Sequence, residues 1–439
     1  MGSSYARLVP AAFMIIIGIG TGLLMLPLAR TDGIGAPFLT ALFTATSATT
    51  VTGLTVVDTA IYWTGFGQAV IFALCQIGGF GIMSGTTLLM LMVSRKHSVS
   101  AQLMVQVEAR GIALGDVKLV LFFALRIMLV VQLLVGLFLS LRFLSYDMPA
   151  MDAFWHGYFH AGSALTNGGF TSLAGGLTPY MQDPSVILTC AIAVVLGGLG
   201  LPVLHDITRH RSRHVAYSLH TKLTLTAAAL LLPLGFAATL LWEWDNAATL
   251  GPLPWLHKLT NALFHSVMTR SGGLNTFDTA AITQDMMLVT YGLMFIGGGS
   301  ASMAGGIKAT TFLVIILAVW FEVRGTADVA VFKRRISSGV LREALTIFAL
   351  AFATVATSTL LMRSLTDLPL RHLVFDIISA FANCGLSMGI TGSLPASGQC
   401  LLIGLMFMGR VGIITVAVGL AMRSSRIQYR YPEERPVIG

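Results

Sequence analysis

Long apolar runs alternate with shorter, mixed stretches along the whole chain. Eight of these runs are long enough to cross a bilayer as helices, since a helix rises about 1.5 Å per residue and the hydrocarbon core is about 30 Å thick. They cover residues 8–29, 64–93, 118–143, 184–206, 221–242, 285–321, 343–363 and 398–423. The pattern predicts an all-α membrane protein with eight transmembrane helices.

A stretch of moderate hydrophobicity ending in glycine separates the two members of each pair of runs. The four stretches are 36–54, 149–170, 254–275 and 369–387, and each is too short to cross the membrane and return as helices. We therefore expect four re-entrant half-helices, each followed by a loop. Irregular backbone survives at membrane depth only where protein buries it or where it lines a watery cavity. Four such stretches predict one shared central pore.

The four stretches align with one another around a single glycine, which indicates an internal repeat. Intervals of 116, 104 and 112 residues separate the equivalent Gly53, Gly169, Gly273 and Gly385. Another glycine-rich signature begins 24 to 28 residues after each of them. The sequence predicts four pseudo-repeated helix–pore-loop–helix units, with boundaries 1–93, 94–206, 207–321 and 322–423, followed by a cytosolic C-terminal tail, 424–439.

Composition and charge narrow the function classes. The chain is 55% hydrophobic and only 10% charged, against about 25% charged residues in soluble domains. Its net charge of +8 comes from short basic clusters between apolar runs, which is typical of cytoplasmic loops, so we exclude nucleic-acid binding and expect both termini in the cytoplasm. The outer segments then carry five basic and eleven acidic residues, a balance that attracts cations.

Rings of backbone carbonyls can replace the water shell of a small cation without burying a fixed charge. A glycine in each loop favours this chemistry, because glycine reaches the dihedrals that aim a carbonyl at a narrow axis. The run Thr50-Val51-Thr52-Gly53 partly resembles the potassium-channel filter TVGYG. Candidate residues of a K⁺ filter, acting through backbone carbonyls, are Val51, Thr52, Gly53, Asn167, Gly168, Gly169, Ser271, Gly272, Gly273, Asn383, Cys384 and Gly385.

Several motifs resemble the potassium-transporting membrane subunits of the Trk/Ktr/HKT superfamily, most closely the KtrB type. The matching stretches are Ala48-Thr49-Thr50-Val51-Thr52-Gly53-Leu54, Gln76-Ile77-Gly78-Gly79-Phe80-Gly81, Thr269-Arg270-Ser271-Gly272-Gly273-Leu274-Asn275, Ala304-Gly305-Gly306-Ile307-Lys308, Asn383-Cys384-Gly385-Leu386-Ser387 and Tyr429-Arg430-Tyr431-Pro432-Glu433-Glu434. In plant relatives, serine in place of Gly53 goes with Na⁺ preference, so glycine points to K⁺. An extra glycine at Gly168 and Gly272 leaves the alignment of loops 2 and 3 open by one residue.

The resemblance also implies an assembly and a location. It implies K⁺ uptake across the bacterial plasma membrane by a multi-pass homodimer in the lipid bilayer. The dimer would rest on a cytosolic ring of nucleotide-binding regulatory subunits of the KtrA, RCK type. Uptake in this family is often stimulated by Na⁺, which makes Na⁺ a candidate coupling or stimulating ion. No organic cofactor is expected in this chain.

A glycine-rich interruption divides the sixth apolar run. Each glycine costs about 1 kcal/mol in a helix interior, so this segment should break the helix, although a dense packing seam is the alternative. In the family it is an intramembrane gate beneath the filter. We expect buried Arg410 to hydrogen-bond its carbonyls and hold it shut, or else to pair with an acid, and Arg270 to brace the third filter loop. Candidate gate residues are Gly297, Gly298, Gly299, Ser300, Ser302, Gly305, Gly306, Lys308 and Arg410.

Other functions remain to be weighed against this one. No zinc-protease or serine-nucleophile motif is present in the sequence, so we do not expect an enzyme. A secondary cation or small-solute transporter of another broken-helix fold is the alternative, but it would show two repeats and midplane acids. His156 and His160 could form a metal pair, although a polar face at the outer mouth is the favoured interpretation. Asp376 is interpreted as a local brace of a helix or loop rather than an ion ligand.

Overall fold

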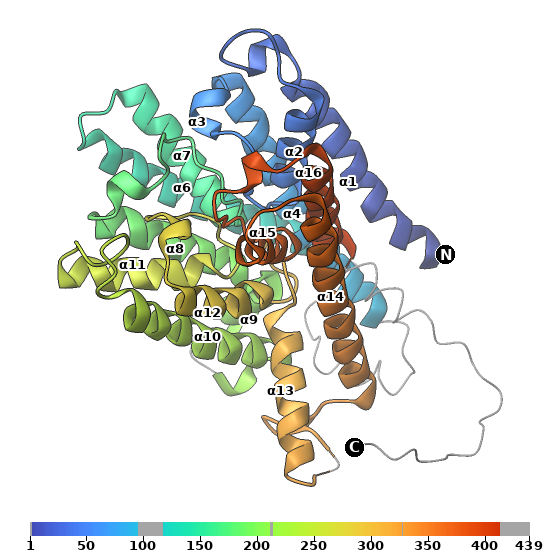
Figure 1. Cartoon of the computed structure of the whole chain (residues 1–439). Helices are drawn as coiled ribbons and strands as arrows, with labels where there is room; N and C mark the ends of the chain where they lie inside the picture. Colours follow the sequence, from blue (N-terminus) through green and yellow to red (C-terminus); the bar gives the residue numbers. More distant parts are fainter. Residues whose placement is uncertain (1, 95–116, 211–213, 327, 413–439) are drawn as a thin grey trace.

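The computed structural model describes residues 2–94, 117–210, 214–326 and 328–412, and it is built almost entirely of helices (Figure 1). The longer elements are α1 (Gly2–Leu24), α4 (Gly65–Ser94), α6 (Val117–Leu144), α8 (Pro184–Leu199), α10 (Leu219–Glu243), α12 (Gln284–Phe295), α13 (Ala309–Val323), α14 (Ser338–Leu365) and α16 (Ala396–Phe407). Two short helices are α3 (Thr59–Tyr62) and α9 (Leu201–His210). The strands of the described residues, β1 (Ala330–Val331) and β2 (Arg334–Arg335), pair antiparallel in one small hairpin.

Four further helices lie inside the four stretches expected to hold half-helices. They are α2 (Phe38–Thr49), α7 (Ala150–Thr166), α11 (Trp255–Met268) and α15 (Leu370–Ala382). A proline stands immediately before each of them, at Pro37, Pro149, Pro254 and Pro369. Proline fixes φ near its helical value and cannot donate to a preceding turn, so it marks the entry of the chain into each half-helix. This fourfold proline signal is visible in the sequence and marks the start of each half-helix.

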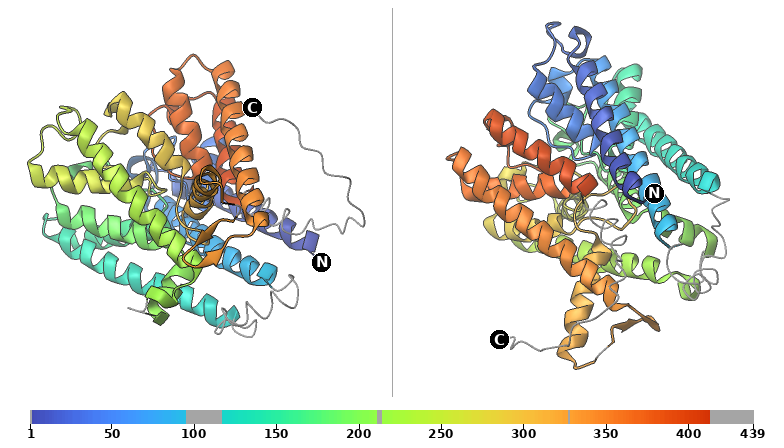
Figure 2. Two further views of the ribbon diagram at one scale, coloured as in Figure 1. Left: turned by 90° about the horizontal axis from the view of Figure 1, so that it is seen from below. Right: turned by 90° about the vertical axis from the view of Figure 1, so that its right-hand side faces the viewer.

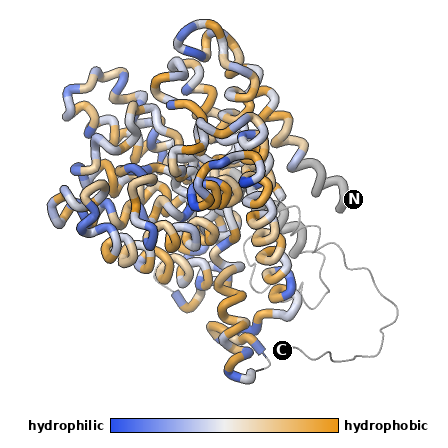
Figure 3. Tube along the Cα trace, in the orientation of Figure 1, coloured by the Kyte–Doolittle hydropathy of each residue, from blue (hydrophilic) through white to orange (hydrophobic). Residues whose placement is uncertain are grey.

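The helices of the four repeats, coloured in sequence order, lie around the middle of the molecule (Figure 2). α7 packs between α6 and α8, and α11 packs against α10 and α8. α15 lies in the same way against α14, α12 and α16. Large apolar side chains on the outer helices, such as Leu133 and Leu134 of α6 and Leu360 of α14, are exposed. Hydrophobic residues run along most of the helices of the molecule (Figure 3). Apolar side chains on the outside suit a lipid environment, in which charged side chains are expensive.

Several apolar runs are not single straight helices. The run 184–206 is not one straight helix, because α8 ends at Leu199 and α9 leaves it at an angle of 97°. Gly200 makes the corner with φ +92°, and a methyl group on its Cα would lie 3.0 Å from the carbonyl oxygen of Ala301. Hydropathy cannot detect such a bend, because both arms of the corner contain apolar residues.

The eight expected spans are seen only in part, because the side chains of α1 and α4, which are 23 and 30 residues long, are described over part of their length. Among the described residues, three helices are long and apolar enough to cross a membrane, at Phe122–Leu144, Leu219–Glu243 and Ser338–Leu365, or four if α8 and α9 count as one bent span. The run 285–321 is divided into α12 and α13, as the glycine-rich interruption predicts. The last run passes from α16 into a π-helical turn, Met408–Gly412, and its remainder lies outside the described residues, as does the tail 424–439.

A hydrogen-bonded cluster ties the loop end of α6 to the start of α8. The Asp183 carboxylate caps α8 by accepting from the Ser185 amide at 3.0 Å, and it also accepts from Arg142 Nε at 2.6 Å and from the Tyr146 hydroxyl at 2.9 Å. Burial alone would raise the pKa of Asp183, but the hydrogen bonds from Ser185, Arg142 and Tyr146 outweigh it and hold the pKa below its usual range.

We predict that Asp183→Ala lowers the free energy of unfolding by about 1–3 kcal/mol, because it removes both a helix cap and a charge-assisted bond. Arg142→Gln should cost less, since that side chain is 41% exposed. A depressed pKa stabilises the fold above the unfolded pKa of about 4 and ceases to do so as the pH falls through the folded pKa. Thermal midpoints in detergent should therefore differ most at neutral pH and converge in acid; a constant difference would contradict this assignment.

Candidate functional site

The loops that follow the four half-helices meet at their glycines. A methyl group built on Gly53 would lie 2.8 Å from the Cα of Gly169, and one on Gly169 would lie 3.1 Å from the Cα atoms of Gly53 and Gly273. One built on Gly385 would lie 3.0 Å from the Cα of Gly273 and 3.3 Å from that of Gly53. The loops are therefore arranged around a closed ring in chain order, with backbone against backbone. No side chain larger than hydrogen fits at any of the four positions.

The same backbone conformation recurs in all four loops. The glycines have φ values of +89°, +67°, +71° and +94°, and the residue two positions earlier is also left-handed in each loop: Val51 (+57°), Asn167 (+62°), Ser271 (+73°) and Asn383 (+49°). Left-handed non-glycine residues are uncommon, and a β-branched residue such as valine is a genuine outlier. Because the same pair of positive φ angles occurs in all four loops, Gly169 and Gly273 are the equivalents of Gly53 and Gly385. This is the alignment predicted from the sequence.

Carbonyl oxygens between these two positions lie close to the ring of glycines. The Gly168 carbonyl oxygen would be 2.7 Å from a methyl group on Gly53, and the Cys384 carbonyl oxygen would be 2.7 Å from one on Gly273. The Thr52 carbonyl oxygen lies against Gly385 in the same way. Three of the four loops thus direct a main-chain oxygen toward the next glycine around the ring, which is a suitable environment for a bare cation.

Serine side chains hydrogen-bond the backbone of three of these loops. The hydroxyl of Ser47 accepts from the Gly53 amide at 3.1 Å, and that of Ser379 accepts from the Gly385 amide at 3.1 Å. Ser163, at the same place in the second half-helix, donates to the carbonyl of Phe170 at 2.7 Å. Each serine stands six residues before the loop glycine of its repeat, a spacing that is visible in the sequence. They fix the loops without occupying the carbonyls near the ring.

A second set of glycines supports the ends of three half-helices. Gly78, Gly197 and Gly409 each lie directly against the carbonyl of the residue four places before the loop glycine: Thr49, Leu165 and Phe381 respectively. The corresponding Gly297 lies instead against the carbonyl of Gly305. The third repeat has therefore exchanged this helix contact for a contact within the glycine-rich segment.

We predict that Gly409→Ala destabilises the protein, because its methyl group would overlap the carbonyl oxygen of Phe381. Gly404→Ala is the matched control in the neighbouring turns of the same span, where no atom lies within 4 Å. The control should be neutral or stabilising by up to about 1 kcal/mol, as alanine is the better helix former. Thermal unfolding and gel filtration in detergent provide the comparison. Equal behaviour of the two variants would mean that the contact at Gly409 has no structural role.

The glycine-rich segment forms a buried loop, residues 296–308, between α12 and α13. Its two ends are joined, since the Gly297 amide donates to the Ile307 carbonyl at 2.9 Å. Its first half is attached to the corner after α8, where the Gly299 amide donates to the Gly198 carbonyl at 2.8 Å and the Met303 amide to the Gly197 carbonyl at 3.1 Å. Broken helix and buried loop agree with the prediction for this segment.

Polar side chains of the predicted gate bond within the loop. The hydroxyls of Ser300 and Thr310 lie 2.7 Å apart, and the Ser302 hydroxyl accepts from the Ala304 amide at 3.2 Å. Lys308 Nζ donates to the Ala304 carbonyl at 2.6 Å. Lys308 therefore belongs to the loop itself and does not extend away from it to reach solvent.

Ser271 joins this buried loop to two of the glycine loops. Its hydroxyl accepts from the Gly305 amide at 2.9 Å and donates to the Asn383 carbonyl at 2.7 Å. The side-chain amide of Asn383 in turn donates to the Thr52 hydroxyl at 2.7 Å and to the Met406 carbonyl at 2.9 Å. One chain of hydrogen bonds thus connects the glycine-rich segment with loops 3, 4 and 1.

The buried arginines differ from expectation. Arg410 is 3% exposed, but none of its guanidinium nitrogens has a hydrogen-bond partner among the described residues, so the predicted bonds to the loop carbonyls are not formed. Arg410 and Lys308 carry like charges that interact electrostatically. Arg270 reaches the Gly297 carbonyl of the buried loop at 3.4 Å, rather than bracing its own loop.

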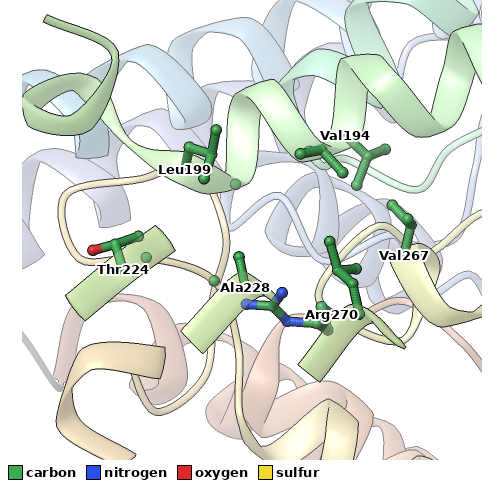
Figure 4. A pocket seen from close by; sticks show the side chains of 11 residues that line it. Val194, Leu199, Thr224, Ala228, Val267 and Arg270 are labelled. Carbon is green, nitrogen blue, oxygen red and sulfur yellow. The ribbon is translucent and has the colours of Figure 1, made fainter. Parts of the chain in front are cut away.

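A small cavity of about 30 Å³ lies beside Arg270, between α8, α10, α11 and the buried loop. Figure 4 shows the guanidinium group pointing toward Ala228 and Thr224, with Val194, Leu199 and Val267 along the other side. Arg270 Nε has no partner among the described residues. The cavity has room for about one or two water molecules that could hydrate this nitrogen.

Four half-helices that end in a ring of glycine loops, with exposed apolar helices around them, indicate a membrane transport protein. The chain matches the TrkH family model, described as a cation transport protein, over residues 7–429. It belongs to the TrkH family of cation transport proteins, which confirms the resemblance to the Trk/Ktr/HKT superfamily.

Characterised relatives cover nearly the full chain. The chain is 36% identical to the Ktr system potassium uptake protein B of Bacillus subtilis, over 96% of this chain and 94% of the relative. It is 32% identical to the potassium/sodium uptake protein NtpJ of Enterococcus hirae, over 99% and 97%. The crystal structure of the potassium transporter TrkH from Vibrio parahaemolyticus has the same fold, with a TM-score of 0.72 at 16% identity, covering 98% of this chain and 86% of that one.

Proposed function

We propose that this chain takes up K⁺ across the plasma membrane through a selectivity filter formed by its four glycine loops. The observation that carries the proposal is the closeness of the four glycines, each of which would bring an added methyl group to within 2.8–3.3 Å of the Cα of a neighbouring loop glycine. Main-chain oxygens of Thr52, Gly168 and Cys384 adjoin this ring. Relatives over the whole chain are named as potassium uptake proteins. The alternative, a transporter of another broken-helix fold, is not supported, because the fold matches TrkH.

The buried loop 296–308 is the proposed gate. It is attached to the corner at Gly200 on one side and, through Ser271, to the filter on the other. Lys308 and Arg410 add two positive charges, which would oppose a passing cation. Opening would require the loop to give up hydrogen bonds such as those from Gly299 and Met303, whose partners are carbonyls of α8.

Assembly and coupling follow the relatives. Ktr relatives are named as parts of a system, which supports further subunits, and we propose a homodimer on a cytosolic ring of nucleotide-binding regulatory subunits with both termini on that side. One relative is named as a potassium/sodium uptake protein, which supports Na⁺ as a transported, coupling or stimulating ion. The proposed repeat units keep the boundaries 1–93, 94–206, 207–321 and 322–423.

Ion flux into liposomes containing the purified chain, with K⁺ and Na⁺ gradients varied separately, tests the filter. We predict that Gly53→Ser reduces the preference for K⁺ over Na⁺ by about tenfold or abolishes uptake, because a side chain there would enter the ring. Gly33→Ala is the control, since Gly33 shares a positive φ of +72° but has open space around it. Uptake of an organic solute instead of K⁺ by the unmodified protein would refute the proposed function.

Ser271→Ala tests the link between filter and gate. The substitution leaves the Gly305 amide and the Asn383 carbonyl without a buried partner, at a cost of about 1–3 kcal/mol each. We expect K⁺ flux in the absence of regulatory subunits to rise and the preference for K⁺ to fall. Ser364→Ala removes a hydroxyl that bonds locally on the exposed face of α14, so it should match the unmodified protein. Unchanged flux and preference in Ser271→Ala would remove Ser271 from gating.

A further inference from the structure

In two of the four half-helices, a buried polar side chain at the same internal position bonds to the loop that follows. Asp376 in α15 and His160 in α7 each stand nine residues before the loop glycine of their repeat. Both contact the hydroxyl of the residue two places after that glycine, Ser387 in one case and Thr171 in the other. The same register therefore joins half-helix and loop in repeats 2 and 4, across the turn that contains the proposed filter.

Asp376 is 1% exposed and holds the segment that follows the fourth loop through three hydrogen bonds. One carboxylate oxygen accepts from the Ser387 hydroxyl at 2.9 Å and from the Thr391 hydroxyl at 2.7 Å. The other accepts from the Met388 amide at 3.0 Å. No basic side chain pairs with it among the described residues, so its oxygens are used entirely for this segment.

His160 is fully buried and makes the equivalent connection in the second loop. Its Nδ1 donates to the His156 carbonyl at 2.7 Å, which places the proton of a neutral ring on that nitrogen. Nε2 then accepts from the Thr171 hydroxyl at 2.9 Å. Both ring nitrogens are occupied by protein, which argues against the metal pair with His156 considered from the sequence.

The other two half-helices lack this connection. The equivalent residues are Thr44, which is 1% exposed and whose hydroxyl has no partner among the described residues, and Phe264, which has no polar group. Loops 2 and 4 lie opposite each other, because the ring of glycines follows chain order. Two opposite loops are therefore braced in this way, although the backbone of the site has fourfold pseudosymmetry.

We propose that Asp376 and His160 are positioning residues that fix the far ends of two opposing filter loops and so set the discrimination between K⁺ and Na⁺. This inference rests on the proposed function of the loops. A carbonyl ring distinguishes the two ions by its size and by the stiffness and number of its oxygens. Loops tied at both sides keep the ring at the width of the larger ion, whereas a loop released at one side can close around the smaller one.

The fourth loop should be the more important of the two. Its carboxylate makes three hydrogen bonds to the segment after the loop, whereas His160 makes one. The segment that Asp376 holds also abuts the first loop, since a methyl group on Gly392 would lie 2.9 Å from the carbonyl oxygen of Val56. Releasing this segment therefore loosens two neighbouring sides of the ring.

The test compares substitutions at the shared register in proteoliposomes. Asp376→Ala removes all three bonds, and we expect the ratio of K⁺ to Na⁺ flux to fall about tenfold while flux itself persists. Asp376→Asn removes the charge but can keep the bonds by rotation of the two hydroxyls, so its ratio should stay within about threefold of the unmodified protein. His160→Ala should give an intermediate loss. Thr44→Ala, at the unbraced position, should change nothing.

Three results would overturn the proposal. The first is an unchanged ratio of K⁺ to Na⁺ flux in well-folded Asp376→Ala. The second is an equal fall of this ratio in Asp376→Asn and Asp376→Ala, which would assign the effect to charge. The third is an equal fall of the ratio in Thr44→Ala. If Asp376→Ala does not give monodisperse protein, Ser387→Ala combined with Thr391→Ala removes the two hydroxyl partners and decides the question by the same criterion.

Thermal stabilisation by K⁺ or Na⁺ in detergent separates this inference from the proposed function. If the unmodified protein is stabilised by neither ion and carries neither, the proposed function fails. If it is stabilised by K⁺ more than by Na⁺, and Asp376→Ala keeps the same difference, the function stands and the positioning role fails. Loss of the difference in Asp376→Ala, with both ions still binding, is the result we expect.

Discussion

The structure depends on how it satisfies backbone polar groups that a lipid environment cannot hydrate. Each half-helix ends inside the protein, and its loop must find partners for amides that no longer belong to a helix. Ser47 and Ser379 bind the amides of Gly53 and Gly385. The carbonyls near the ring remain directed toward it. The same arrangement that makes the loops possible in a membrane thus supplies the oxygens that a cation needs.

The third repeat differs from this arrangement where it contacts the buried loop 296–308. Val267 stands where the other half-helices carry a serine, and Gly297 contacts Gly305 instead of the end of a half-helix. In exchange, Ser271 and Arg270 bond to the buried loop at its two ends. The third glycine loop therefore lacks the hydrogen bond from its own half-helix and is bonded instead to the buried loop, which is the proposed gate. Asymmetry in a pseudo-fourfold structure therefore marks where regulation of the proposed pore would act.

The sequence predicted the positions of the half-helices because glycine spacing and short apolar length are both local signals. It did not predict the corner at Gly200, since apolar residues continue through the bend, and it did not predict the helix α9 beyond it. The direction of a side chain was harder still. Arg410 lies in the interior as predicted, but its lack of hydrogen bonds depends on the direction of its side chain, which no sequence pattern encodes. Asp376 was read correctly as a brace, whereas its match with His160 emerged only from the contacts.

Two buried cations in a path proposed for cations require a physical reason. A charge in the membrane interior is expensive unless a partner or water compensates it, and neither Lys308 nor Arg410 has an acidic partner among the described residues. Lys308 is held by the Ala304 carbonyl of its own loop, so any movement of that loop carries the charge with it. Arg410 is attached to a different span. When the loop moves, the repulsion between the two cations and the repulsion of each toward K⁺ would both change. Electrostatics would therefore couple the position of the loop to ion passage, in addition to the hydrogen bonds of Ser271.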